Sequence, residues 1–413
     1  MAIRGRHGLW QIQIGLEIHA QILCKTKLFS NASCNKLETQ PNTRVDLFDA
    51  ALPGSLPVLN QECVTQTIRT GIALQSTIQN QSFFERKHYY YCDMPTGYQI
   101  TQQRGPLATG GHITLENTTV RINRIQLEQD SGKSIHDLIP DSTLIDLNRA
   151  GSALMEIVCE PDITTPEEAG EVIKTLQGLL RHVGTCDGQM EDGSMRCDLN
   201  VSVKKVGKDV EMGERVEIKN MNSIRNVVRA ATYEGKRQVE ALENGDIIEQ
   251  ETRTYDAVSG KTRRMRKKES AADYRFFPEP DLPPLSLSKE YIQHIIDTMP
   301  ELPQETEIRL QNTYGLTSYE TTILLAEMGA VDYYEAMIHG TTRSPKLVIN
   351  WLLNDLFGLL RLNNIPLRNS PVSSDRLGEL LDLIEDSTIS GKIAKVFTQP
   401  FFVYILKNFY NVY

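Results

Sequence analysis

A regular alternation of apolar and polar residues runs through positions 11–22. Apolar residues hold the even positions from Ile12 to Ile22, and polar residues, among them Glu17 and His19, hold most of the odd ones. A period of two is typical of a β-strand with one buried and one polar face. Glu17 and His19 therefore project from the same face, about 7 Å apart along the strand at a rise of ~3.4 Å per residue.

The same alternation recurs in four later segments, and each carries an acid on its polar side. The segments are 124–128, 154–158, 196–203 and 216–219, and their acids are Glu128, Glu156, Asp198 and Glu217. Alternating strands are typical of antiparallel sheets that bury one face, rather than of doubly wound parallel sheets. We therefore predict an α+β fold with an antiparallel sheet whose polar face carries several carboxylates.

Helical signals fall between these strands. Thr165 precedes Pro166 as a capping residue, which predicts the start of one helix. A second helix is predicted to begin near Ser223 and to end at Asn244-Gly245.

The period of the apolar residues changes in the last third of the chain. From residue 289 to about residue 395 a 3.6-residue period dominates, which predicts a separate all-α domain. We therefore expect a first domain at residues 1–288, a helical domain at 289–395, and an atypical, aromatic-rich end at 396–413.

Two interpretations of the strand acids remain open. Closely packed carboxylates repel one another, and a divalent cation such as Mg²⁺ is the usual compensation because it prefers oxygen ligands. The other interpretation is a solvated face of an antiparallel sheet. The alternation by itself favours this second interpretation, because such strands routinely expose polar residues to water.

Two further segments are rich in charged residues. Asp130-Ser131-Gly132-Lys133-Ser134 is not a P-loop, because Leu127 stands where that motif requires a glycine. Lys133 either contacts a phosphate or lies in a surface turn. The basic run at 260–268 either contacts an RNA backbone or forms an exposed hairpin arm. No sequence motif marks a catalytic nucleophile. If the reaction of this protein consumes ammonia, we therefore expect another chain to produce it.

Composition narrows the class of protein. The formal net charge of −9 argues against a general nucleic-acid coat protein but leaves room for a local basic surface. The seven cysteines are scattered and form no C-x-x-C pair, so we expect a reducing compartment and no disulfide framework. We find neither a secretory signal core nor a segment apolar enough to span a bilayer, which predicts a cytoplasmic protein.

Eight segments, taken in their order along the chain, together resemble a known family over roughly residues 10–395. The segments that carry the resemblance are Gly15–His19, Tyr98–Gln102, Asp130–Ser134, Asp146–Gly151, Met155–Val158, Gly193–Asn200, Glu217–Ser223 and Asp273–Asp281. They are similar to the B subunit of the bacterial and organellar aspartyl/glutamyl-tRNA amidotransferases. The resemblance implies a catalytic cradle related to glutamine synthetase, an antiparallel sheet with a polar, metal-bearing face, and it favours the metal interpretation of the acids.

The resemblance also implies roles for individual residues. The positions that match the family's Mg²⁺ ligands at an ATP site are Glu17, His19, Glu128, Glu156, Asp198 and Glu217. The catalytic candidates are Glu128, Lys133, Arg196 and Lys219. Of these, Lys133 and Lys219 are expected to contact the phosphates of ATP. Zinc is not expected, because Cys34 stands alone where zinc-binding members carry paired cysteines.

The implied reaction has two steps. The side-chain carboxylate of a misacylated Glu-tRNA(Gln) or Asp-tRNA(Asn) attacks the γ-phosphate of ATP, and ammonia then displaces phosphate. Mg²⁺ offsets the charge that develops on the phosphates. The implied partners are a glutaminase A subunit, which makes the ammonia, and a small C subunit, which completes a heterotrimer.

Two other functions remain open from the sequence. One is an ATP-dependent ligase that acts on a free amino acid, and the other is a non-catalytic RNA-binding scaffold. Residues 396–413 resemble nothing in the family's tail domain, and a truncation or reading-frame change is one explanation. We expect this end to weaken tRNA binding more than it affects the chemical step.

Overall fold

The computed structural model describes residues 2–35, 40–136, 138–207, 212–267, 274–327, 329–363 and 365–395. The chain divides into two compact units, Met1–Pro300 and Glu301–Tyr413. The division falls twelve residues later than predicted (300 − 288 = 12), because helix α4 (Lys289–Asp297) buries Ile295 in the core of the first unit. The aromatic-rich end at 396–413 lies outside the described residues.

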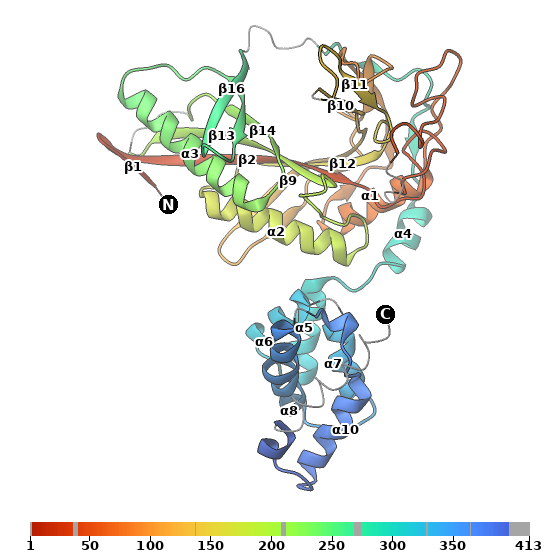
Figure 1. The fold of residues 1–413 in the computed structure, drawn as a ribbon, viewed down its shortest axis with the longest axis vertical. Coiled ribbons are helices and arrows are strands. Elements are labelled where there is room, and N and C mark those ends of the chain that lie inside the picture. Colours follow the sequence, from red (N-terminus) through yellow and green to blue (C-terminus); the bar gives the residue numbers. More distant parts are fainter. Residues whose placement is uncertain are drawn as a thin grey trace. The chain divides into compact units, whose positions relative to one another are not determined.

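The first unit is built on one large sheet (Figure 1). Its strands, in order, are β16 (Lys261–Lys267), β15 (Glu251–Asp256), β14 (Val216–Met221), β13 (Met195–Lys205), β2 (Gly8–Gln21), β12 (Ala153–Cys159), β9 (Thr119–Gln129), β7 (Ala108–Thr109) and β3 (Thr77–Ile78). Two short strands extend it, with β1 (Ile3–Gly5) beside β2 and β8 (His112–Thr114) beside β9. The strands predicted from alternation are thus β2, β9, β12, β13 and β14.

The sheet is mixed rather than purely antiparallel, which corrects the predicted fold. Strands β14 and β15 pair in parallel, with Glu217 opposite Thr252 and Lys219 opposite Thr254. The chain between them forms helix α3 (Ile224–Glu243), so that β15 begins at the same end of the sheet as β14. Such a crossover makes the next strand parallel to the previous one.

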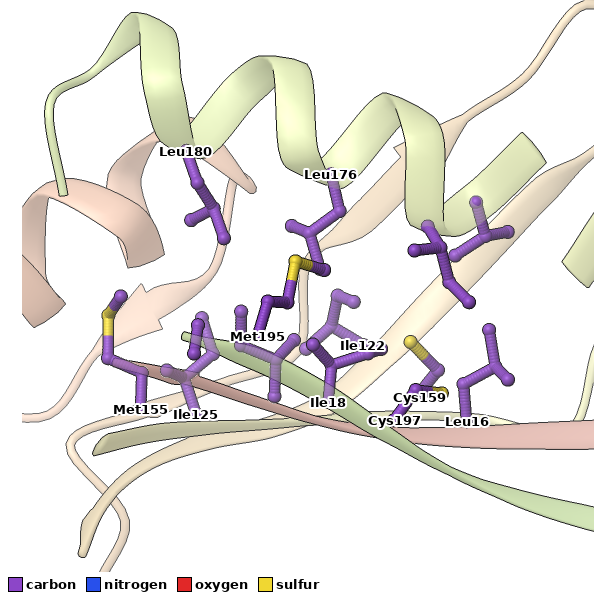
Figure 2. Packing of buried hydrophobic residues seen from close by; sticks show 14 of the residues in the cluster. Leu16, Ile18, Ile122, Ile125, Met155, Cys159, Leu176, Leu180, Met195 and Cys197 are labelled. Carbon is purple, nitrogen blue, oxygen red and sulfur yellow. The ribbon is translucent and has the colours of Figure 1, made fainter. Parts of the chain in front are cut away.

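Helices cover the apolar face of this sheet. Helix α2 (Pro166–His182) packs Leu176 and Leu180 onto side chains of β2, β9, β12 and β13 (Figure 2). Ile18 at the centre of β2 is fully buried there. Helix α1 (Gln61–Ala73) and α3 bury further residues in the same core. The opposite face of the sheet is therefore the one that carries the polar side chains.

The predicted helix ends are confirmed. Thr165 accepts a hydrogen bond from the backbone N–H of Glu168, and Glu168 reaches back to Thr165, forming a capping box at the start of α2. Ser223 caps α3, and the helix ends at Asn244 before Gly245, whose φ of 85° is in the left-handed region.

Three small sheets complete the first unit. They are β17 (Phe277–Pro278) with β5 (Glu85–His88) and β6 (Tyr98–Thr101), β10 (Lys133–Ile135) with β11 (Leu144–Asp146), and β18 (Leu285–Ser286) with β4 (Gln81–Ser82). The first of these lies over the polar face of the main sheet, since Gln99 on β6 donates to the carbonyl of Gln129 at 2.6 Å.

The second unit is helical, as the 3.6-residue period predicted. Its helices are α5 (Pro303–Tyr314), α6 (Ser318–Ala326), α7 (Ala330–Ile338), α8 (Pro345–Asn350), a π-helical turn at Trp351–Leu356, α9 (Phe357–Leu362), a 3₁₀ turn at Leu367–Asn369 and α10 (Ser374–Glu385). They share a separate core that includes Tyr334 and Leu352. Within the described parts of both units, no helix has the length and apolar character needed to cross a membrane.

Candidate active site

The polar face of the main sheet brings side chains from four neighbouring strands into one row. His19 on β2 lies opposite Glu156 on β12 and also opposite Arg196 on β13. Gln126 on β9 lies opposite Glu156 and extends the row. Directly opposed residues of antiparallel strands share a face, so these four side chains project to the same side.

A second row lies two residues further along β2. Asp198 on β13 is opposite Glu17, and in the next row Asn200 on β13 is opposite both Gly15 on β2 and Glu217 on β14. The side-chain amide of Asn200 donates to Glu17 Oε1 at 3.0 Å. The alternation therefore placed the strand acids correctly on one face of the sheet.

A cavity of about 290 Å³ opens on this face. It is lined by His19, Lys87, Tyr89, Gln99, Glu128, Asp130, Ser131, Arg149, Leu154, Arg196, Asp198 and Asn220. The small sheet that contains β5 and β6 supplies one wall, through Lys87 and Gln99. The cavity thus joins the polar face to segments that the strand pattern does not include.

His19 and Glu128 form a buried ion pair in this cavity. The imidazole Nδ1 lies 2.7 Å from Glu128 Oε1. Burial by itself lowers the pKa of His19, but the charge and hydrogen bond of Glu128, with Glu156 and Asp198 nearby, raise it to about 9. Burial works in the opposite sense on Glu128, and His19 outweighs it, so the pKa of Glu128 is lowered. The pair is therefore charged at neutral pH.

Glu156 differs from Glu128 in its environment. Burial, followed by the negative charge of Glu128, raises the pKa of Glu156 to about 7. A hydrogen bond from the side-chain amide of Gln126 holds one of its carboxylate oxygens. The two carboxylates are thus close enough to repel each other, as the chemical argument for a metal requires.

Asp198 is held from β14. Lys219 Nζ donates to Asp198 Oδ2 at 3.0 Å and lies 2.9 Å from Glu217 Oε1, so one ammonium group joins both acids. The backbone N–H of Asn220 donates to Asp198 Oδ1 at 2.9 Å. Asn220 has a φ of 61°, a left-handed conformation that asparagine tolerates better than most residues. Burial raises the pKa of Asp198, but Lys219, His19 and Asn220 outweigh it and lower the pKa.

Two arginines are fixed beside the acids through Asp130. Arg196 makes a bidentate contact with Asp130, at 3.0 and 3.2 Å. Arg149 Nε lies 3.4 Å from the same carboxylate, and its guanidinium also donates to the carbonyls of Ser131 and Gly132, at 3.0 and 2.7 Å. Both guanidinium groups are therefore oriented by the protein itself.

The predicted metal ligands share this face but already have protein partners. Among the residues that the structure describes, no group of three or more histidine, cysteine, aspartate or glutamate side chains is arranged as a metal site. Metal binding by Glu17, His19, Glu128, Glu156, Asp198 and Glu217 therefore stays a prediction. Lys133 is exposed on β10 and is not among the described residues that line the cavity, so its phosphate contact also stays a prediction.

An aromatic cavity of about 230 Å³ adjoins the first one. Lys87 and Tyr89 line both cavities, and Lys219, Tyr91 and Tyr274 line the second. The ring of Tyr89 lies 5.6 Å from that of Tyr91 and 6.3 Å from that of Tyr274. Lys87 Nζ lies 5.0 Å from the centre of the Tyr274 ring. A flat ring and an anionic group fit such a set of aromatic and basic residues.

A larger cavity, of about 530 Å³, lies on the helix-covered side of the sheet. It runs between β1, the start of α2 and the face of α3 that carries Lys236 and Val239. Its lining includes Ile12 together with exposed or partly exposed charged side chains such as Arg4, Glu167 and Lys236. We place the functional site in the smaller polar-face cavity, because buried charged groups with shifted pKa values are typical of active sites.

Several cavity residues were missed as site residues in the sequence. Lys87 and Arg149 come from segments without regular alternation, and Asp130 follows the end of β9. A signal was nevertheless present, because Asp130 and Arg149 lie in segments that carry the family resemblance. Lys219 and Arg196 were predicted, and the structure brings both to this region.

Comparison with known proteins identifies the family of this chain. The family described as the GatB/GatE catalytic domain matches residues 12–293, and the one described as the GatB domain matches residues 332–402. The second match reaches into the segment 396–413, which was predicted to differ from the family throughout. Residues 396–413 lie outside the described residues, so the difference expected there stays a prediction.

Curated relatives match nearly the whole chain. The mitochondrial B subunit of the glutamyl-tRNA(Gln) amidotransferase of Phytophthora infestans is 50% identical, over 95% of this chain and 81% of its own length. The B subunits of the aspartyl/glutamyl-tRNA(Asn/Gln) amidotransferases of Acidiphilium cryptum and Rickettsia bellii are each 49% identical, with the same two coverages. The chain therefore belongs to the GatB/GatE family of tRNA amidotransferase B subunits.

Proposed function

We propose that this chain amidates misacylated Glu-tRNA(Gln), Asp-tRNA(Asn) or both in an ATP-dependent reaction. The observation that carries the proposal is the polar-face cavity, where buried acids and oriented cations stand next to an aromatic cavity. The names of the relatives support the tRNA substrate, and each of them names a B subunit of an amidotransferase.

The proposed chemistry activates a carboxylate, which by itself is a poor electrophile. An oxygen of the substrate's side-chain carboxylate attacks the γ-phosphorus of ATP, and ADP leaves with the electrons of the broken P–O bond. Ammonia then adds to the acyl carbon, phosphate leaves, and the ammonia nitrogen loses a proton as the amide forms. Positioning and charge stabilisation are the main contributions that a protein makes to phosphoryl transfer.

The basic residues of the cavity are suited to orient the anionic groups. Arg196 is fixed by Asp130, and Lys219 is fixed between Asp198 and Glu217, so neither side chain needs to be reoriented when a phosphate arrives. Arg149 and Lys87 add positive charge on the opposite side of Asp130 and in the wall shared with the aromatic cavity. We assign phosphate or substrate-carboxylate contacts to these four residues.

The acids supply the oxygen donors that a magnesium ion requires. Glu128 and Asp198 line the cavity, and Glu156, Glu17 and Glu217 lie on the same face of the sheet, with His19 paired to Glu128. The fit rests on the chemistry of the donors, because several carboxylates share one face of the sheet and oxygen is the ligand that Mg²⁺ prefers. A bound Mg²⁺ would supply neutralisation of the phosphate charges.

The aromatic cavity is suited to a nucleobase. Tyr89 packs edge-to-face with Tyr91 and with Tyr274, and these rings line the cavity beside Lys87 and Lys219, so a base can contact them while its phosphates extend into the polar-face cavity. We assign this cavity to the adenine of ATP. The rest of the proposal follows the family resemblance, which implies a cradle related to glutamine synthetase and two partners, a glutaminase A subunit together with a small C subunit.

One assay tests the whole proposal. The chain is mixed with the A and C subunits of a relative, ATP, Mg²⁺ and glutamine, and each misacylated tRNA is followed for amidation. We expect amide formation that requires ATP, and a loss of at least a hundredfold in Asp198→Asn and Glu128→Gln, because positioned catalytic charges contribute roughly this much. The matched control is Glu116→Gln, which changes an exposed glutamate in the loop after β8.

The outcomes separate the competing functions. Near-normal amidation in both cavity variants would show that the cavity is not the site. ATP cleavage that depends on a free amino acid rather than on charged tRNA supports a different ligase. Binding of tRNA without any ATP-dependent reaction supports a non-catalytic scaffold.

A further inference from the structure

Two cysteine thiols meet just beyond the end of β2. The Sγ atoms of Cys24 and Cys34 are 3.7 Å apart, although the two residues are ten positions apart in the sequence. Neither lines the polar-face cavity. The sequence spacing had indicated that Cys34 stands alone. In the structure its thiol has a neighbour, Cys24.

The backbone holds the two cysteines on adjacent arms of a short hairpin. Thr26 and Ser33 form an isolated antiparallel bridge, and the N–H of Cys34 donates to the carbonyl of Lys25 at 3.0 Å. In this register Cys34 lies opposite Lys25, next to Cys24 in the chain. The hairpin thus brings the two segments together, while the contact between the thiols themselves is shown by the 3.7 Å between their Sγ atoms.

A buried ion pair anchors this hairpin to the rest of the first unit. Lys27, between the two arms, is fully buried and lies 2.8 Å from Asp49 Oδ2. Ser30 donates to the same carboxylate, and the N–H of Leu28 donates to the carbonyl of Gly151 at 3.1 Å. The hairpin is therefore held in place, and the two thiols remain neighbours without a covalent bond.

The exposure of the three nearest thiols differs. Cys24 and Cys34 are both partly exposed, whereas Cys63 on α1 is buried. The hydrogen bond to Cys24 and then burial raise the pKa of Cys34. The hydrogen bond with Cys34 lowers the pKa of Cys24, but contact with Cys63 and burial outweigh it and raise the pKa. Thiolate is therefore scarce near neutral pH, and proximity rather than acidity favours a bond between these two residues.

We propose that Cys24 and Cys34 form a reversible disulfide when the protein meets a low-molecular-weight disulfide. The thiolate of one cysteine attacks a sulfur of the small disulfide, releases one small thiol and leaves a mixed disulfide. The thiolate of the other cysteine then attacks the protein sulfur and releases the second small thiol. Two electrons pass from the protein thiols to the small disulfide, and the two protons are recovered on the released thiols.

The test uses the full chain and oxidised glutathione. After incubation, free thiols are alkylated, and the protein is cut with trypsin without reduction. We expect one linked pair of peptides, residues 7–25 joined to residues 28–36, because cleavage follows Arg6, Lys25, Lys27 and Lys36. The link itself consumes two of the seven thiols, exposed Cys92 loses a third to a mixed disulfide, and dithiothreitol restores all three.

Variants distinguish this pair from general oxidation. Cys24→Ser and Cys34→Ser should each abolish the linked peptides, and Cys63→Ala should retain them. Cys92, which is exposed, reports whether glutathione reaches the protein, because it forms a mixed disulfide only. Mixed disulfides on Cys24 and Cys34 without the internal link overturn the proposal, and so does a link that joins Cys63, within residues 45–69, to either residue.

Discussion

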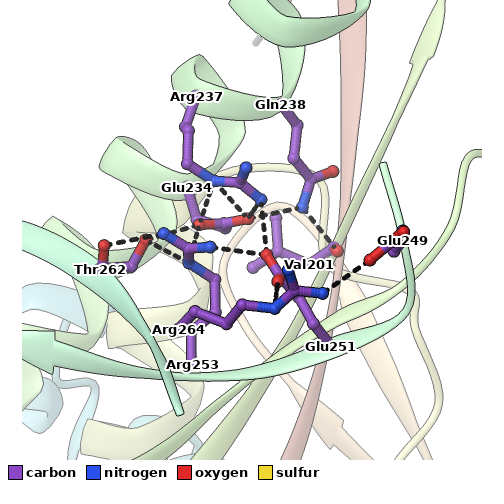
Figure 3. Close-up of polar contacts among 9 residues, drawn as sticks. All are labelled: Val201, Glu234, Arg237, Gln238, Glu249, Glu251, Arg253, Thr262 and Arg264. Atoms are coloured by element: carbon purple, nitrogen blue, oxygen red, sulfur yellow. Dashed lines mark hydrogen bonds and ion pairs between the residues drawn. The ribbon is translucent and has the colours of Figure 1, made fainter. Parts of the chain in front are cut away.

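A buried carboxylate on α3 connects this helix to the β15–β16 hairpin (Figure 3). Glu234 is fully buried and accepts hydrogen bonds from Arg237 Nη2 at 2.6 Å, from Gln238 Nε2 at 3.0 Å and from Thr262 Oγ1 at 2.8 Å. Arg253 Nε lies 3.6 Å from its second oxygen. The substitution Glu234→Gln keeps the size of this side chain but removes its charge.

The expected cost follows from the partners that are left behind. Removing one member of a buried ion pair costs about 3–5 kcal/mol. Arg237 and Arg253 are 24% and 12% exposed at their side chains, so water recovers part of that cost. Glu251 lies beside both arginines and offsets another part. We therefore expect Glu234→Gln to lower the free energy of unfolding of the first unit by about 2–4 kcal/mol.

The cost should depend on pH in a defined direction. Burial raises the pKa of Glu234, but Arg237, Gln238 and Thr262 outweigh it, so the pKa is lowered in the folded protein. A lowered pKa contributes stability that is complete above the unfolded value, about 4.3, and is lost as the pH falls through the folded value. The gap between the parent protein and Glu234→Gln should therefore be constant above about pH 5 and close in stronger acid.

The assay must report on the first unit alone. The chain has two tryptophans, Trp10 in the first unit and Trp351 in the second, so urea unfolding is followed by Trp10 fluorescence in a Trp351→Phe background. The matched control is Glu240→Gln, an exposed position on α3, which should change stability by no more than about 0.5 kcal/mol. A loss below about 1 kcal/mol, or a gap that does not close in acid, refutes the reasoning.

Other predictions concern the core, the site and the division of labour. Leu176→Ala should cost about 3–5 kcal/mol in the same unfolding assay, because the side chain is fully buried against the sheet; a cost near zero contradicts the packing. Asp130→Asn should lower kcat for amidation about tenfold or more with little change in KM, since it releases Arg196; a change confined to KM contradicts this role. Tyr89→Leu should raise the KM for ATP by about tenfold, and an unchanged KM argues against base stacking. The isolated chain should not hydrolyse glutamine, and hydrolysis at rates near those of amidation disproves the expected separation of the two activities.

Local sequence pattern predicted the strands, their polar face and the helix caps, because each depends on neighbouring residues alone. Alternation identified β2 and placed Glu17 and His19 on the right side of it. It did not predict the parallel pair of β14 and β15, because the direction of a strand depends on where the preceding helix packs. It also assigned α4 to the wrong domain, since a helical period does not show which core the helix buries its apolar face against.

The cavity was predicted only in part for a similar reason. His19, Glu128 and Asp198 lie on regular strands, whereas Lys87 and Arg149 reach the cavity from segments brought there by tertiary folding. The contact between Cys24 and Cys34 depends on a hairpin that the pattern of apolar and polar residues does not predict. The cytoplasmic, reducing compartment stays a prediction. The relative from Phytophthora infestans is named as a mitochondrial protein.

The charges that line the polar-face cavity restrict the kind of ligand that it can bind. Its described lining has three carboxylates, from Glu128, Asp130 and Asp198, and three permanent cations, from Lys87, Arg149 and Arg196, besides the paired His19. A bare polyanion would meet cations that are already paired with these acids, His19 with Glu128, Arg196 with Asp130 and Lys219 with Asp198. A phosphate chain with a divalent cation would match both sets, because the acids would be available to the cation and the arginines to the phosphate oxygens. This balance of fixed charges favours a metal-bound nucleotide over a free anion as the ligand of the site.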